Sequence, residues 1–490
     1  MRFMDIKKSR VKKYAGLLAA AVLLTGVASA LSGCAQADQD VFGEGAGITA
    51  ATESVEAEEN GRITEPEEAG GETENFTGEE ERAAEAPADG EIQNEKERVK
   101  VRGIYVTGPM AGTANMDALI DLVDRTELNT MVIDIKNDEG YVVCDMDAKI
   151  IQEVGSVRRY VRDMPALVQK CKEKDIYLIA RIVAFKDPVL AEAKPEWCLH
   201  KEDGTVFLDK SGQPWLNPYE KEVWEYLTEV AGGAVDLGFD EVQFDYIRFS
   251  TDSGMEQVDF GDLEKEASRE EIIAEFAAYA VQKLHDKGAF VSADVYGSVI
   301  DSEVDQQIVG QDYLALAECL DYISPMVYPS HYGANSYRIP VPDAQPYETV
   351  LSAMQASKKA LAGMPPMKAG EDAEEETVSA NAAPVSGNAV SESPDDKWKN
   401  MTAEEIAVLE PLKTVQADVR PWLQDFTASW VKGHISYGPE QIRAQIQAVY
   451  DAGYEEWILW NAANRYTEDG LNAAERPEEK TDEQPEEGGA

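Results

Sequence analysis

The chain has 490 residues and a formal net charge of −48, from 93 acidic and 45 basic side chains. This excess argues against nucleic acid as a ligand, because the phosphate backbone would be repelled. More than half of the excess lies in three polar segments that hold few large apolar residues, 35–98, 370–400 and 467–490. We predict that residues 35–98, 365–400 and 467–490 are disordered, since they cannot bury enough apolar surface to offset chain entropy.

The first 34 residues have the pattern of a targeting signal. Six basic residues between Arg2 and Lys13 precede an apolar segment at 15–31, and the sequence Leu-Ser-Gly-Cys ends at Cys34. This order resembles a bacterial lipoprotein signal. The resemblance implies that the peptide is cut before Cys34 and that its thiol is lipidated. We therefore expect an extracytoplasmic protein anchored to the bacterial cell membrane. The alternative is an uncleaved anchor helix.

From residue 99 to residue 466, short apolar runs alternate with amphipathic segments. Eight strands are predicted, at 101–107, 130–136, 176–182, 238–249, 290–297, 322–329, 415–422 and 456–461. The predicted helices lie between them, at 116–125, 156–173, 220–237, 268–287, 311–320, 347–362 and 439–452. This alternation predicts a (β/α)8 TIM barrel with long βα loops. The rival is a doubly wound open sheet, which would want a GxGxxG turn after its first strand. No GxGxxG motif is present, which favours the barrel. The last predicted helix is weak, so closure of the barrel would depend on a short or atypical final helix.

Chemically functional side chains gather at the ends of the predicted strands, where TIM barrels place their active sites. The three acids are Asp134, Asp245 and Asp294. Cations, aromatics and amides accompany them, namely Lys136, Arg181, Tyr246, Arg248, Tyr328, His331, Trp422, Gln424, Trp460 and Asn461. Such a set of side chains at the carboxyl-terminal mouth of the barrel is suited to binding carbohydrate. Sugar faces stack on aromatic rings, and sugar hydroxyls need hydrogen-bond donors and acceptors in fixed directions. Each acid also has a structural alternative. For Asp245 it is an ion pair with Arg248 or Arg181.

Three motifs carry a resemblance to a known family. They are FDYIRF at 244–249, SADVYG at 292–297 and SPMVYPSHY at 324–332. They resemble the glycoside-hydrolase barrel domain found in many bacterial lipoproteins, a distant relative of the alpha-amylase-like barrels with an undefined substrate. The resemblance implies that Asp245 is the nucleophile and Asp294 the acid/base. In related enzymes the second acid is often Glu. We expect Arg248 to orient Asp245 and to keep it ionised.

The sequence thus predicts a glycoside hydrolase that acts on an extracellular or cell-wall polysaccharide. The alternatives are a non-catalytic glycan-binding barrel of the cell envelope and a purely structural scaffold. No cofactor or metal is expected, because the chain has four histidines, no CxxC pair, and no GxSxG, P-loop or HExxH motif. We expect a monomer.

Overall fold

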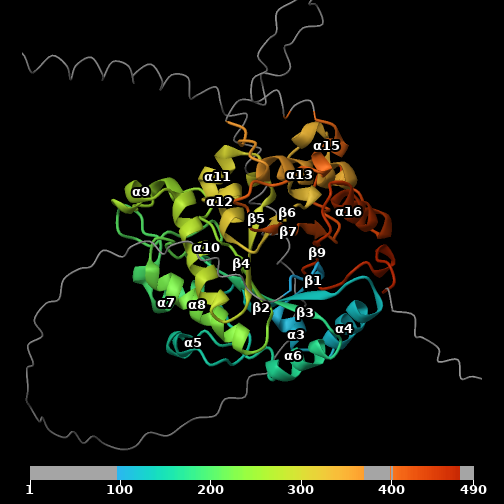
Figure 1. Ribbon diagram of the computed structural model, residues 1–490. Helices are drawn as coiled ribbons and strands as arrows, with labels where there is room; N and C mark the ends of the chain where they lie inside the picture. Colours follow the sequence, from blue (N-terminus) through green and yellow to red (C-terminus); the bar gives the residue numbers. More distant parts are fainter. Residues whose placement is uncertain (1–96, 369–397, 399–400, 475–490) are drawn as a thin grey trace, which may run out of the picture.

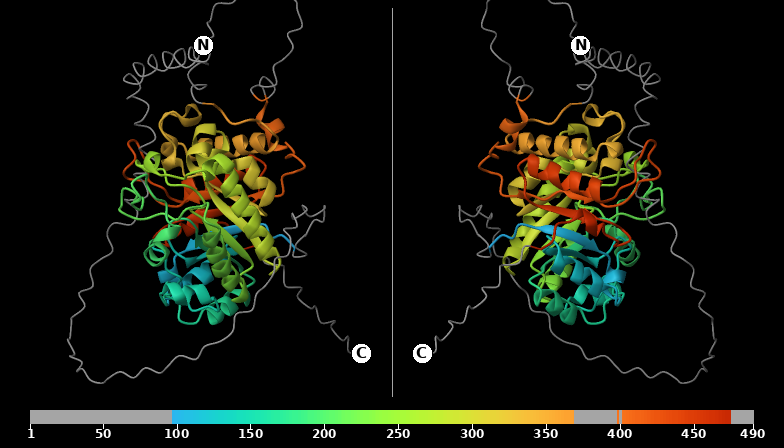
Figure 2. Two further views of the ribbon diagram at one scale, coloured as in Figure 1. Left: turned by 90° about the vertical axis from the view of Figure 1, so that its left-hand side faces the viewer. Right: turned by 90° about the vertical axis from the view of Figure 1, so that its right-hand side faces the viewer.

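The computed structural model describes residues 97–368, 398 and 401–474. In these residues a ring of helices surrounds a central group of strands (Figure 1), and Figure 2 shows the same arrangement from two sides. The strands are β1 (Arg102–Val106), β2 (Thr130–Lys136), β3 (Tyr177–Val183), β4 (Glu241–Asp245), β5 (Phe290–Tyr296), β6 (Tyr322–Met326), β7 (Asp418–Val419), β8 (Trp422–Gln424) and β9 (Trp457–Trp460). The predicted signal, most of the acidic linker, most of the insertion and the end of the tail lie outside the described residues.

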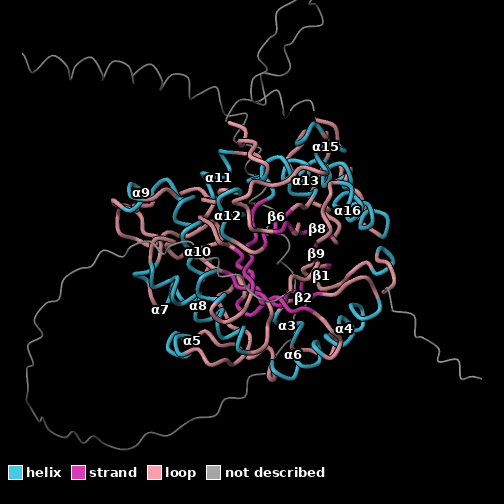
Figure 3. Tube along the Cα trace, viewed as in Figure 1, coloured by secondary structure: helices cyan, strands magenta, loops and turns pink. Residues whose placement is uncertain are grey.

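The strands form one closed parallel barrel. Their order is β5-β4-β3-β2-β1-β9-β8-β6, and pairing of β5 with β6 closes the circle. Both β7 and β8 pair with β6, so together they form one interrupted strand. The interruption contains Pro421, which has no backbone N–H to donate to the ladder. The structure therefore confirms the predicted (β/α)8 barrel, with eight strand positions at its centre (Figure 3).

Helices cover the outside of the barrel between successive strands. They are α3 (Gly108–Ala111), α4 (Met116–Arg125), α5 (Lys149–Val154), α6 (Met164–Lys172), α7 (Pro188–Ala193), α8 (Lys221–Asp236), α9 (Leu263–Glu266), α10 (Arg269–His285), α11 (Glu303–Val309), α12 (Tyr313–Cys319), α13 (Pro346–Leu361), α15 (Ala403–Ala407) and α16 (Pro439–Asp451). No helix of the described part of the chain is both long and apolar enough to cross a membrane.

Several boundaries differ from the prediction. The fourth strand, expected at 238–249, spans only Glu241–Asp245, and the seventh, expected at 415–422, is divided into β7 and β8. The helix expected at 156–173 begins only at Met164, because the Asp163 side chain caps it by accepting from the Ala166 amide at 3.0 Å and Pro165 occupies its first turn. At the other end, the described chain continues past the predicted barrel limit of 466 to residue 474. It forms a short 3-10 turn, Glu468–Gly470, and Ala473 pairs with Thr126. This segment takes the place of a long final helix.

The barrel interior is filled by side chains of alternate strand residues. Aromatic residues dominate this inner cluster, including Tyr105, Tyr177, Phe290, Tyr322 and Trp422. A second and larger core lies between the strands and the helices. A packed interior leaves the carboxyl ends of the strands as the place where chemistry is possible.

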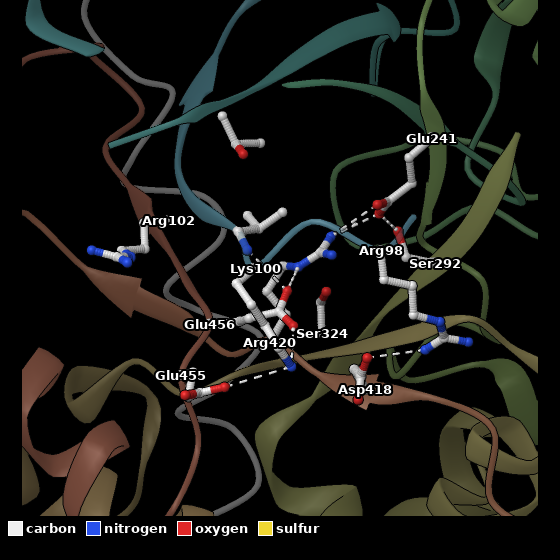
Figure 4. A network of polar contacts seen from close by, with 12 residues as sticks. Arg98, Lys100, Arg102, Glu241, Ser292, Ser324, Asp418, Arg420, Glu455 and Glu456 are labelled. Carbon is white, nitrogen blue, oxygen red and sulfur yellow. Dashed lines mark hydrogen bonds and ion pairs between the residues drawn. The ribbon is translucent and has the colours of Figure 1, made fainter. Parts of the chain in front are cut away.

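A buried charged network lies deeper in the barrel, toward the amino ends of the strands (Figure 4). The Arg420 guanidinium donates to Glu241 at 2.8 Å and to Glu456 at 3.1 Å. Ser292 and Tyr177 also donate to Glu241, and the Val101 amide donates to Glu456. The network therefore ties together strands that are far apart in the chain.

Candidate active site

The carboxyl ends of β2, β3 and β4 bring two acids and one guanidinium together. Asp134 and Arg181 are register partners on β2 and β3, and Asp245 is the last residue of β4. Arg181 donates through Nη1 to Asp134 at 2.7 Å and through Nε to Asp245 at 3.0 Å. None of the three side chains is more than 11% exposed. Arg181 thus compensates both buried carboxylates, which would otherwise be costly to desolvate.

The second oxygen of Asp245 is held by the chain that follows it. The Tyr246 amide donates to Asp245 Oδ1 at 2.6 Å. Tyr246 has a φ of +51°, in the left-handed region that non-glycine residues seldom adopt. Backbone strain of this kind clusters at functional sites, where the surrounding structure maintains it. Here it coincides with a fixed carboxylate at the end of the strand.

Asp294 ends up beside Asp245 in a different environment. The register of β4 and β5 pairs Phe244 with Ala293, so the next residue on each strand is one of the two acids. Asp294 is 2% exposed and accepts a hydrogen bond from Trp422 Nε1 at 2.6 Å. Burial, and then the nearby Asp245 charge, raise the pKa of Asp294 well above its ordinary value. One acid of the pair is thus matched by a cation, and the other is biased toward its protonated form.

Aromatic rings pack against these acids. The Tyr105 ring stacks on Trp460 with centroids 4.0 Å apart, and Trp422 meets Trp460 edge-on at 5.6 Å. The Tyr105 hydroxyl donates to Asp134 at 2.7 Å. The Arg181 guanidinium lies over the Tyr105 and Trp460 rings, at 5.4 and 5.6 Å from their centroids. The Tyr328 ring also belongs to this group of aromatic rings, with its centroid 6.5 Å from that of Trp460. Burial, and then the Asp294 charge, raise the pKa of the Tyr328 hydroxyl.

Two predicted site residues lie apart from this group. Lys136 is fully buried, 2.8 Å from the Asp187 carboxylate, and donates to the Val183 carbonyl at 2.6 Å. A register shift between Asp134 and Lys136 breaks the alternation that would have directed both side chains into the barrel. Arg248, which we expected to orient Asp245, lies against the rings of Trp215, Tyr246 and Tyr296 and donates to the Phe249 carbonyl. The orienting cation that the structure places on Asp245 is Arg181.

Two predicted amides organise the loops at the mouth. Gln424 accepts from the Ser330 amide at 3.0 Å and donates to Asp343 and to the Phe426 carbonyl. Asn461 donates to the carbonyls of Asp425 and Arg465. Because these bonds occupy both amide groups, they hold loops in place.

His331 lies at the edge of the mouth. Its ring meets the Tyr328 ring edge-on at 5.1 Å, and its Nδ1 is 3.0 Å from the Ser330 hydroxyl. The residue is half-buried. It therefore extends the aromatic wall that Tyr328 begins.

Tyr105 was not among the predicted site residues, although alternation along the first strand would have placed it in the barrel interior. Phe426 and Trp430, which follow β8 and continue the row of rings, were not predicted either. Their distance from the end of β8 hid them, since loop residues have no periodicity to follow.

Among the ionisable groups at the mouth, the carboxyl groups of the three aspartates could take part in a reaction. Within the described residues, no cluster of three or more His, Cys, Asp or Glu side chains has an arrangement that could hold a metal ion. The cysteines at 144, 171, 198 and 319 are free thiols. Glycosidases use a pair of carboxyl groups in unlike environments.

Fold and site together define a glycosidase-like TIM barrel. The sequence matches the model of the family described as "Putative glycosyl hydrolase domain" over residues 103–369 and 385–466. The chain therefore belongs to this family, as the motifs at 244–249, 292–297 and 324–332 had indicated. A search of curated proteins gave no match.

Several solved structures are similar. A hypothetical protein from Ruminiclostridium thermocellum is 38% identical, with a TM-score of 0.36, over 39% of this chain and 97% of its own. The glycoside hydrolase domain of PgaB (BpsB) from Bordetella bronchiseptica is 11% identical, with a TM-score of 0.48, over 74% and 94%. The spore cortex-lytic enzyme SleL from Bacillus megaterium is 11% identical, with a TM-score of 0.39, over 77% and 73%. The family assignment rests on the sequence match.

Proposed function

We propose that this protein hydrolyses glycosidic bonds of an extracellular or cell-wall polysaccharide, with Asp294 as proton donor and Asp245 as its carboxylate partner. The observation that carries the proposal is the contrast between the two acids. Asp245 is paired with the Arg181 guanidinium, whereas burial and the Asp245 charge raise the pKa of Asp294. A glycosidase needs one carboxylate and one carboxylic acid at the same bond.

The roles follow from these two environments. The Asp294 carboxylic acid gives its proton to the glycosidic oxygen as the bond to the anomeric carbon breaks. In a retaining reaction Asp245 attacks that carbon, and water then releases the sugar while Asp294 takes back a proton. In an inverting reaction Asp245 instead removes a proton from the attacking water. Anomeric proton NMR of the first product distinguishes the two outcomes.

The test uses the full chain and a panel of polysaccharides, with release of reducing ends as the measurement. Asp294→Asn should lower the rate about 10²–10⁴-fold. Asp245→Asn should abolish turnover. Nitrophenyl glycosides need little help from an acid, so Asp294→Asn should be far less impaired on them. The control is Asp236→Asn, an exposed acid paired with Lys287. Full turnover by Asp245→Asn would contradict the proposed role of Asp245 in hydrolysis.

One observation favours a second candidate, glycan binding without hydrolysis. The Asp245 carboxylate is occupied by Arg181 and by the Tyr246 amide. A carboxylate held in this way also suits a fixed acceptor for sugar hydroxyls. Saturable binding to a polysaccharide that the parent never cleaves would favour this candidate.

We also propose that the barrel is a monomer held outside the cytoplasm by a lipid on Cys34. The basic, apolar and Leu-Ser-Gly-Cys parts of the first 34 residues support the anchor. Cys34→Ser should prevent incorporation of labelled palmitate and leave the signal peptide uncleaved, whereas a chain that begins at residue 35 should be found in the soluble fraction. Light scattering on that soluble form should give the mass of one chain. Palmitate incorporation that survives Cys34→Ser would contradict the lipid anchor.

A further inference from the structure

A row of aromatic rings leads from the proposed site to the protein surface. It begins at Trp460 and continues through Tyr328, Phe426 and Trp430, with successive centroids 6.5, 6.1 and 6.0 Å apart. Trp460 is half-buried. From Tyr328 outward, burial decreases along the row. Tyr328 is buried, Phe426 is half-buried, and Trp430 is 38% exposed. The row therefore connects the acids inside the barrel with an open aromatic face.

Trp430 is unusual among the exposed apolar side chains. Across residues 97–368, 398 and 401–474, the other large apolar side chains of comparable exposure are Leu208, Leu263, Met367, Val408 and Leu412. Trp430 alone is aromatic, and its ring lies nearly parallel to Phe426, with an interplanar angle of 19°. Single exposed apolar residues are ordinary. An exposed indole in line with the rings of a proposed sugar site is a more specific feature.

The loop that carries these rings is held by buried polar contacts. Gln424 donates to the Phe426 carbonyl and to Asp343, while Asp343 also accepts from the Ile435 amide. The Tyr437 hydroxyl donates to the Asp343 carbonyl, and Asp343 is fully buried. The loop is thus tied at both ends to one aspartate. A platform ordered before binding loses little entropy when a ligand stacks on it.

We propose that Phe426 and Trp430 form an outer sugar-binding subsite, so that the substrate is an oligosaccharide or polysaccharide bound over several units. This inference rests on the proposed function and specifies its substrate class. Two rings lie between Trp460 and Trp430 in the row, so a single sugar unit bound at the acids does not also contact Trp430. A longer chain gains the stacking contact with Trp430, and a disaccharide does not. Trp430 is therefore a specificity residue for chain length and takes no part in bond cleavage.

The test measures binding in the full chain with the Asp245→Asn substitution, so that no turnover interferes. Calorimetry compares chitohexaose with chitobiose, cellohexaose with cellobiose, and maltohexaose with maltose. At least one hexamer should bind more tightly than its dimer. Trp430→Ala should weaken that hexamer about tenfold, the scale of one lost stacking contact, and leave the dimer unchanged. Trp430→Phe should restore part of the loss.

The matched control is Leu412→Ala, because Leu412 is 39% exposed but precedes β7 at the amino end of the barrel. It should leave every affinity unchanged. A hexamer preference that survives Trp430→Ala, or no preference in any series, overturns the subsite. Turnover by the parent together with an unaffected Trp430→Ala refutes the subsite but leaves the proposed function intact. Binding that depends on Trp430 in the absence of any turnover by the parent supports the subsite but refutes the proposed hydrolysis. No binding in any series counts against both.

Discussion

Asp245 and Asp294 carry the same functional group at the ends of neighbouring strands, yet their partners differ. Arg181 donates two bonds to Asp245, whereas the neutral indole of Trp422 donates one to Asp294. A cation favours the ionised form of a carboxyl, and burial disfavours it. The difference between the two acids therefore comes from Arg181 on β3, the strand next to that of Asp245, and from Trp422 on β8.

The raised pKa of Asp294 predicts a pH-dependent cost in stability. Its folded pKa lies above the unfolded value of about 3.9, so the stability from its proton is complete below that value and is lost as pH rises through the folded pKa. Asn cannot ionise and can still accept from Trp422. We expect Asp294→Asn to melt at a higher temperature than the parent at alkaline pH, with the difference closing near pH 4.

Melting curves from about pH 4 to pH 9 would measure this effect, with Asp236→Asn as the control for the loss of one surface charge. A difference between parent and Asp294→Asn that stays constant over this range would contradict the raised pKa. The same titration predicts that the rate of the parent falls as pH rises, because the proton donor is lost.

At the scale of elements, the loop after β4 is fixed by α11. The Phe249 amide donates to the Val309 carbonyl at 2.8 Å, and Gly310 ends α11 with a φ of +75°. A Cβ atom at Gly310 would stand 2.9 Å from the Arg269 carbonyl oxygen and from the Phe249 ring. Close packing at this glycine therefore positions the chain that leaves Asp245.

The chain offers a matched pair of glycines to test this packing. Gly155 ends α5 with a nearly equal φ of +73°, but a Cβ atom added there would meet nothing within 4 Å. Gly155→Ala should cost about 1 kcal/mol from the left-handed backbone alone. Gly310→Ala should cost at least twice as much, since the contact adds to the same strain. Urea denaturation measures both, and equal losses would show that the contact is easily relieved.

The elements also show what sequence patterns can and cannot predict. Alternation along the fourth and fifth strands places Asp245 and Asp294 on one face, and the register confirms that they are neighbours. Strict alternation fails for Lys136, because a shift of register in β2 leaves no trace in the residue types. Arg181 and Asp245 are 64 residues apart. The sequence identifies both residues as rim candidates but does not reveal that they pair.

At the scale of the whole molecule, the barrel depends on the charges buried near its amino end. Arg420 and Glu241 are fully buried, and Glu456 is 3% exposed. Their bonds join the seventh strand position to β4 and β9, and through Glu456 to the chain just before β1. Ion pairs of this kind are costly to break because each partner left behind is a buried, uncompensated charge.

Arg420→Met should therefore destabilise the protein by about 3–5 kcal/mol, measured by urea denaturation. The control is Arg125→Met. Arg125 pairs with Glu468 at 2.7 Å, but both side chains are nearly half exposed, so we expect little change. A similarly small loss for Arg420→Met would mean that water or a rearranged side chain replaces the guanidinium.

The contact between Tyr105 and Trp460 joins the first strand of the barrel to the last. The Asn464 amide, 359 residues further along the chain, also donates to the Tyr105 carbonyl. Closing so long a loop is slow and carries a large entropy cost, so this seam is expected to form late in folding. That last strand supplies Trp460, which is one of the two rings that Arg181 lies over and the first ring of the row that leads to Trp430. A nascent or nicked chain without β9 would therefore lack both the closing strand of the barrel and the ring at which the aromatic row begins. We expect glycan binding to appear only once the last strand has joined the first, so that binding reports completed folding.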